Sequence, residues 1–230
     1  MRAMTINVTS LVSLVSDLNK SDFSEYPNIW SEVQQLMHDC EWFKVYDIIE
    51  VLYATFVRND ENNGLEDATL FANEVNEFFV DEGIGWQLVD GQITARGTET
   101  FESVVKDSTA ALVASDRPTA ATHLREALQD LSRRPEPDLA GAIYHAMGAL
   151  EGLARDLTGD SKATLGEILK RYPQFLPKPL DMAISQLWGY ASNEARHVQE
   201  GRGPDRDEAE LIVGLCAAIS GYLTRKHKKM

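Results

Sequence analysis

Cysteine is scarce in this 230-residue sequence, where Cys40 and Cys216 lie far apart and show no paired spacing with histidines. A disulfide framework needs more cysteines than this, and a Cys/His zinc site needs closely spaced pairs. The pattern suits a reducing cytosol. We therefore predict a cytoplasmic protein with no bound metal and no cofactor.

Long apolar runs are missing as well. Thr, Asn, Ser and Asp interrupt the apolar residues of the first 18 positions, which lack the continuous stretch of a signal peptide, and no other run is long enough to span a bilayer. Hydrophobic residues still make up 43% of the chain, enough to build a core. We expect a folded protein that is neither exported nor membrane-bound.

The common catalytic signatures are absent too. The chain has no Gly-rich phosphate loop, no G-x-S-x-G, no H-E-x-x-H and no CxxC. Most enzyme classes are thereby disfavoured, and any chemistry has to be sought in clusters of polar side chains on helices.

Basic residues are scarce in the first half of the chain. Residues 1–120 hold 7 Lys and Arg against 21 Asp and Glu, whereas residues 121–230 hold 15 of each sign. An acidic surface repels RNA and suits a basic protein partner, while the neutral half allows RNA to approach locally. The basic cluster at residues 225–229 is typical of the last turn of a helix, where cations complement the dipole.

Helical periodicity dominates the first half, with short helices expected over residues 5–19 and 27–39 and core helices over 42–57 and from about 65 until Gly83. Asp90-Gly91, between two alternating runs, predicts a hairpin over residues 86–95 in which Leu88 pairs with Ile93. A two-stranded ribbon is marginal alone, so the hairpin must lie on a helix.

Five helices are expected in the second half, over residues 119–132, 138–157, 162–171, 179 to about 200, and 205 to about 225. The break at residues 116–118 contains Pro118, which fits the start of a new helix. The fold class is therefore mostly α, with an acidic N-terminal helical domain, 1–116, that includes the hairpin, and a C-terminal helical bundle, 117–230.

One polar cluster interrupts an apolar helix, where Asn193, Arg196, His197 and Glu200 fall at i, i+3, i+4 and i+7 and share a face. In a phosphate-handling site, His197 would move a proton and Arg196 would hold a phosphate. The alternative is structural, since Arg196 and Glu200 also form an ordinary i,i+4 ion pair.

A second candidate is Glu151, on a helix whose small residues allow another helix to approach closely. Its carboxylate could pair with Arg196 across the two helices. It also stands at i,i+4 from Arg155, so that an ion pair without a functional role remains open.

Four stretches resemble AbiJ-like abortive-infection proteins. Their C-terminal HEPN-type domain is resembled by AGAIYHAMGALEGLARDLTGDSKATLGEILKRYP and PLDMAISQLWGYASNEARHVQEGRGPDRDEAELIVGLCAAISGYL, and the accompanying N-terminal domain by WFKVYDIIEVL and NEVNEFFVDEGIGWQLVDGQITARG. The resemblance implies a four- or five-helix bundle, often dimeric, in phage-defence or toxin-like systems. Many HEPN domains are metal-independent RNases in which an Arg and a His on facing helices drive attack of the RNA 2′-OH on the adjacent phosphate.

The sequence departs from that catalytic pattern, which places four to six residues between the Arg and the His. Here Arg196 and His197 are adjacent and point about 100° apart on a helix. Arg117 and His123 do have five residues between them, but they lie at the domain junction, and we interpret that match as chance.

Two functions remain open. The first is an HEPN-like sensing or partner-binding module of phage defence, with the acidic half as contact surface. The alternative is an endoribonuclease or toxin that cleaves RNA through Arg196 and His197, supported by Asn193, Glu200 and Glu151. The wide apolar stripe of the last helix predicts a homodimer through the C-terminal bundle, which would bring Arg196 and His197 near their counterparts.

Overall fold

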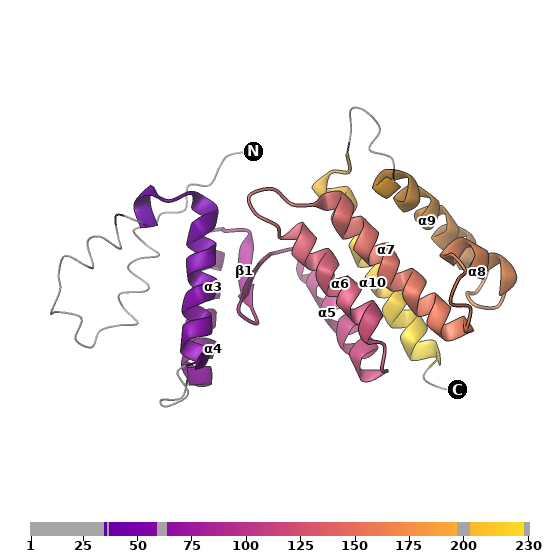
Figure 1. Cartoon of the computed structure of the whole chain (residues 1–230), viewed down its shortest axis with the longest axis horizontal. Helices are drawn as coiled ribbons and strands as arrows, with labels where there is room; N and C mark the ends of the chain where they lie inside the picture. Colours follow the sequence, from indigo (N-terminus) through magenta and orange to yellow (C-terminus); the bar gives the residue numbers. More distant parts are fainter. Residues whose placement is uncertain (1–34, 36, 59–63, 197–202, 228–230) are drawn as a thin grey trace. The chain divides into compact units, whose positions relative to one another are not determined.

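The computed structural model describes residue 35 and residues 37–58, 64–196 and 203–227, with no side-chain description for 192–196. These residues are mostly helical, with one two-stranded sheet, as predicted (Figure 1). They form two compact units, Met1–Arg96 and Gly97–Met230. The predicted helix 5–19 and most of 27–39 lie outside the described residues.

The first unit contains two helices and a hairpin: α3 (Trp42–Arg58), α4 (Gly64–Asp81), β1 (Trp86–Val89) and β2 (Gln92–Ala95). Both helices bury one apolar face, as the periodicity predicted, and their aromatic rings meet inside, with Tyr46 edge-on to Phe79 at 5.9 Å. The buried core of this unit consists of Met37, Val45, Tyr46, Ile49, Phe71, Val75, Phe79, Ile84, Leu88 and Ile93.

The hairpin has the predicted register. Leu88 pairs with Ile93 and Trp86 with Ala95, which buries Leu88 and Ile93 on one face. Asp90 and Gly91 have positive φ angles of 50° and 81°, as a two-residue turn of type I′ requires. A Cβ on Gly91 would lie 2.7 Å from Cδ1 of Tyr53, so glycine is needed there for space as well as for backbone conformation.

The hairpin lies on both helices, as a ribbon of two strands requires. The side-chain amide of Asn76 on α4 donates to the carbonyl of Leu88 at 2.9 Å and accepts from its N–H at 2.7 Å. The carboxylate of Glu50 on α3 accepts from the N–H of Ile93 at 2.7 Å. Polar side chains therefore satisfy backbone groups that a lone hairpin would leave to water.

The second unit is a helical bundle of α5 (Glu99–Ala114), α6 (Pro118–Leu131), α7 (Leu139–Thr158), α8 (Leu165–Arg171), α9 (Leu180–Arg196) and α10 (Arg206–His227). Local sequence explains their ends: Asp138 caps α7, Gly159 closes it in a left-handed conformation, and Thr164 with Glu167 forms a capping box on α8. Figure 1 shows α8 and α9 beside α7, and each packs against it.

The two units meet in sequence at Arg96–Gly97, earlier than the 116/117 boundary expected from the Pro118 break. The difference concerns α5, which we expected in the N-terminal domain. Val105 and Leu112 of α5 are buried in the core of the second unit, and α5 packs against α10 and α6. A break in helical periodicity marks the end of a helix but does not show which core that helix joins.

Helix α10 lies between two neighbours, because it packs against both α5 and α7. This explains the wide apolar stripe noted in the sequence, since Ala209, Ile212, Val213, Cys216 and Ala217 are all buried within the chain. These five residues, part of the stripe from which a dimer was inferred, are thus covered without a second subunit, whereas Ile219 and Tyr222 of the same stripe are partly buried. No helix in the described parts of the chain is long and apolar enough to cross a membrane.

Candidate functional site

Two of the predicted catalytic residues, Asn193 and Arg196, lie in the last turns of α9. Their side chains, together with His197 and Glu200, fall outside the described residues. The helix pair on which the prediction depends does exist, because α9 packs against α7, which carries Glu151. The proposed grouping of these side chains stays a prediction.

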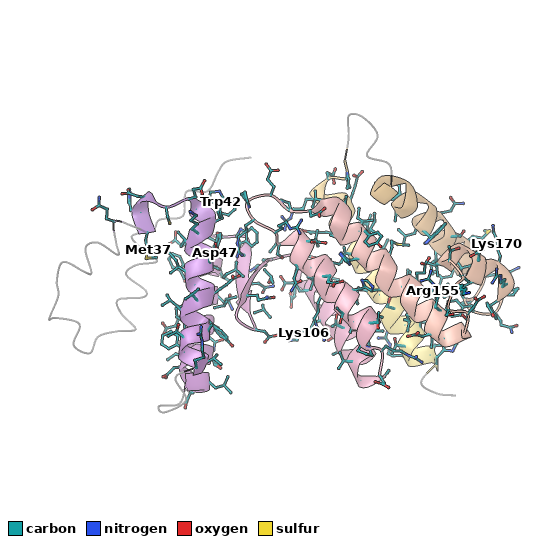
Figure 2. The ribbon with its side chains drawn as sticks, viewed as in Figure 1. Met37, Trp42, Asp47, Lys106, Arg155 and Lys170 are labelled. Atoms are coloured by element: carbon teal, nitrogen blue, oxygen red, sulfur yellow. The ribbon has the colours of Figure 1, made fainter. Side chains whose placement is uncertain are left out.

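Glu151 has defined partners within α7 and at the start of α8. One carboxylate oxygen accepts from Nη2 of Arg155 at 2.6 Å, and the other accepts from the N–H of Leu165 at 2.9 Å. Arg155 in turn donates from Nε to the carbonyl of Ala163 at 2.7 Å. Arg155 lies on the side of α7 that faces α8 (Figure 2).

These contacts give Glu151 a structural role. The N–H of Leu165 belongs to the first turn of α8, where backbone donors lack partners within the helix and a carboxylate is favourable. The i,i+4 pair with Arg155, which the sequence offered as the alternative to catalysis, is present. Through these hydrogen bonds, Glu151 and Arg155 together hold the loop between α7 and α8 in place.

A second cluster of ionisable side chains lies between α6 and α7. His123 and Glu126 come from α6 and His145 from α7, and their nearest atoms form a small triangle. Nδ1 of His123 lies 3.2 Å from Nδ1 of His145, and Oε2 of Glu126 lies 3.1 Å from the former and 3.0 Å from the latter. With Asp130, these residues form what we call the His–carboxylate cluster.

Asp130 completes the cluster from one turn further along α6. Its Oδ2 atom lies 3.7 Å from Nε2 of His145, on the side of the ring away from Glu126. Burial raises the pKa of Asp130 above its ordinary value, and the negative charge of Asp138 raises it further. The ring of Tyr144, largely exposed, stands edge-on to His145.

Small residues on α7 let the two helices come close enough for this cluster to form. Ala146 and Ala149 are fully buried, and a Cβ on Gly148 would lie 3.6 Å from the His123 ring. The sequence had suggested such an approach for this stretch. Arg117, which is separated from His123 by five residues in the spacing treated as chance, instead pairs with Asp156 at 3.6 Å.

Sequence reasoning missed this cluster. His123, Glu126 and Asp130 stand at i, i+3 and i+7 on one helical stretch, a spacing that places polar side chains on one face. That spacing could have predicted a polar face on this helix. His145 comes from the next helix, however, and its alignment with His123 depends on how the two helices pack.

A shallow groove of about 360 Å³ runs between the start of α5 and the first half of α10. Phe101 and Val104 form its α5 side, and Leu211 and Leu215 form its α10 side. Asp207 and Glu210 stand at its rim. The groove thus combines an apolar floor with two acidic side chains.

Comparison with known proteins finds one family. Residues 5–111 match the family model for AbiJ N-terminal domain 4, which supports an AbiJ-like family of the abortive-infection type. No curated protein and no solved structure matches the chain. The matched segment extends into α5, so that the family domain and the first compact unit do not coincide.

Proposed function

We propose that this chain is a homodimeric, partner-binding component of an abortive-infection system. The match of residues 5–111 to an AbiJ domain supports the defence role. The observation that carries the dimer is an exposed apolar stripe on α10, distinct from the buried stripe that the sequence analysis had used.

This exposed stripe consists of Leu211, Leu215 and Ala218, at i, i+4 and i+7. Leu211 is 62% exposed and Leu215 is 39% exposed, although both belong to a helix whose other faces are buried. Spacings of four and three residues are those of a seam between two helices. The stripe also borders the α5–α10 groove, which widens the apolar surface.

The charges of α10 favour a second copy in antiparallel orientation. The first turn carries Asp207 and Glu208, and the last turn carries Arg225, Lys226 and His227. Two antiparallel copies of α10, paired along their whole length, would set each acidic end against a basic end, whereas a parallel pair would align like charges. A two-fold axis generates this arrangement from one stripe.

We place the binding surface for the partner on the first unit because that unit is acidic. Residues 1–96 hold 17 Asp and Glu against 5 Lys and Arg, whereas the remaining residues are close to neutral. A surface of one sign attracts partners of the opposite sign and speeds their encounter. The proposed partner is therefore a basic protein surface, and its binding should weaken as salt is added.

Light scattering after gel filtration tests the dimer. Full-length protein at micromolar concentration is expected at twice the chain mass of 25.7 kDa. The double substitution Leu211→Glu and Leu215→Glu is expected to give the monomer, because four carboxylates would meet at the seam. In a phage challenge of cells that express the protein, the same variant should lose protection.

The matched control is Leu180→Glu, since Leu180 is an exposed leucine of the same unit on another helix. This variant should remain dimeric and protective. A monomeric wild type, or a double variant that stays dimeric, would contradict the proposal that the α10 stripe is the dimer interface.

A metal-independent endoribonuclease is the second candidate function. It is favoured by the packing of α9, which carries Asn193 and Arg196, against α7, which carries Glu151. In this alternative Arg196 binds the phosphate and His197 moves the proton, and Glu200 supports them.

Incubation with a mixed RNA pool in the presence of a chelator separates the two candidates. For a binding module we expect no cleavage. RNA fragments that end in 2′,3′-cyclic phosphate, produced by wild type and absent with Arg196→Ala and His197→Ala combined, would assign the nuclease instead. Circular dichroism of the double variant checks that the helices are intact.

A further inference from the structure

We propose that His123, Glu126 and His145 bind a divalent transition-metal ion. The site lies between α6 and α7, and no metal was expected from the sequence. The inference goes beyond the proposed function, because it depends neither on the dimer nor on a protein partner.

The distances between the three donor atoms fit a single shared ion. The three donor atoms lie 3.0, 3.1 and 3.2 Å from one another. Donors bound to one ion at about 2.0–2.2 Å must be separated by about 3.0–3.5 Å, depending on whether the geometry is octahedral or tetrahedral. The side chains are therefore already spaced as ligands of one ion, and an ion about 1 Å above their plane would reach all three.

Hydrogen bonds alone do not satisfy this triangle when Glu126 is ionised. Each Nδ1 atom either carries a proton and donates or has a lone pair and accepts, and an ionised carboxylate only accepts. If both histidines donate to Glu126, two N–H groups oppose each other at 3.2 Å. If only one donates, a histidine lone pair faces the carboxylate. A shared cation removes the conflict, because all three atoms then direct a lone pair at the ion.

The position of Asp130 near His145 also favours a metal site. A histidine that binds a metal through Nδ1 keeps its proton on Nε2, and a carboxylate commonly accepts from that proton and orients the ring. Oδ2 of Asp130 lies 3.7 Å from Nε2 of His145, and its side chain is only 14% exposed. This separation is longer than a hydrogen bond. A small rotation of the ring toward Oδ2 would make Asp130 the orienting residue, and it would then act on the ion through His145.

The ligand set selects the class of ion. Two imidazoles and one carboxylate suit zinc and neighbouring first-row ions, whereas magnesium and calcium prefer oxygen ligands alone. The ligand side chains are 28–40% exposed, so that solvent can reach the ion. Water or an anionic group of another molecule would complete the coordination, as in open zinc sites.

The test is a titration of tag-free, chelator-treated, full-length protein with Zn²⁺ against a competing indicator. We expect one ion per chain, no binding of Mg²⁺ under the same conditions, and a visible spectrum of bound Co²⁺. His123→Gln and His145→Gln combined should weaken Zn²⁺ binding by at least about 100-fold, and Asp130→Asn by about 10-fold, as is usual for the loss of an orienting partner.

His38→Gln is the matched control, because His38 is an exposed histidine of the first unit beside a single carboxylate. It should bind Zn²⁺ as wild type does. Glu126→Gln, which keeps the size of the side chain, gives a second variant if the double variant loses its helical circular dichroism. Absence of stoichiometric binding to wild type would overturn the proposal, as would unchanged affinity in Glu126→Gln.

Discussion

Glu151→Ala is expected to lower the free energy of unfolding by about 1–2 kcal/mol, toward the lower end of the usual effect of removing hydrogen bonds, because the groups concerned are partly buried. The substitution removes both the partner of Arg155 and the acceptor for the N–H of Leu165. Because these contacts hold the start of α8 on α7, the loss should appear in urea denaturation followed by circular dichroism.

Two companion variants sharpen this result. Glu151→Gln keeps an oxygen that can accept from Leu165, so its loss should be smaller. Glu136→Ala removes an exposed glutamate between α6 and α7 and should change stability by no more than about 0.5 kcal/mol. If Glu151→Ala instead abolished RNA cleavage without altering the urea midpoint, Glu151 would belong to the nuclease of the second candidate function.

Most of the fold prediction depended on local sequence patterns. The hairpin followed from Asp90-Gly91 between two alternating apolar runs, because a two-residue turn fixes the register of both strands. The helices followed from apolar spacing and from their capping residues, which act within one turn. Such features depend on neighbours in sequence, and the sequence contains them directly.

Features that depend on packing between helices were harder to predict. His145 joins His123 because α6 packs against α7, with room for small residues such as Gly148 beside the His123 ring, and no spacing within one helix encodes that contact. The exposed stripe of α10 was hard to predict from the sequence for a related reason. Its wide apolar set suggested a dimer, but α5 and α7 cover most of that set, and the exposed apolar residues are Leu211, Leu215 and Ala218.

The position of α5 leads to a prediction about where the second unit begins. A fragment of residues 97–230 contains all the buried residues of its core, whereas a fragment of residues 117–230, cut at the boundary expected from sequence, lacks α5. We expect the longer fragment to unfold cooperatively, with helical circular dichroism, and to elute as a dimer in gel filtration, because it retains the exposed stripe of α10.

The shorter fragment should lose cooperative unfolding and aggregate. Without α5, the core loses Val105 and Leu112, and burial of each such side chain contributes about 1.5–3 kcal/mol. The face of α10 that packs on α5 also becomes exposed to water. Against a typical net stability of about 5–15 kcal/mol for a whole domain, these losses are large.

A peptide of residues 97–116 added to the shorter fragment provides the control. It should restore part of the helical signal and the thermal transition, because it supplies the missing helix in trans. If residues 117–230 were as stable alone as residues 97–230, the sequence boundary would be the correct one, and α5 would be a linker that merely rests on α10. The matched family segment, which extends to residue 111, would then end close to a true domain boundary.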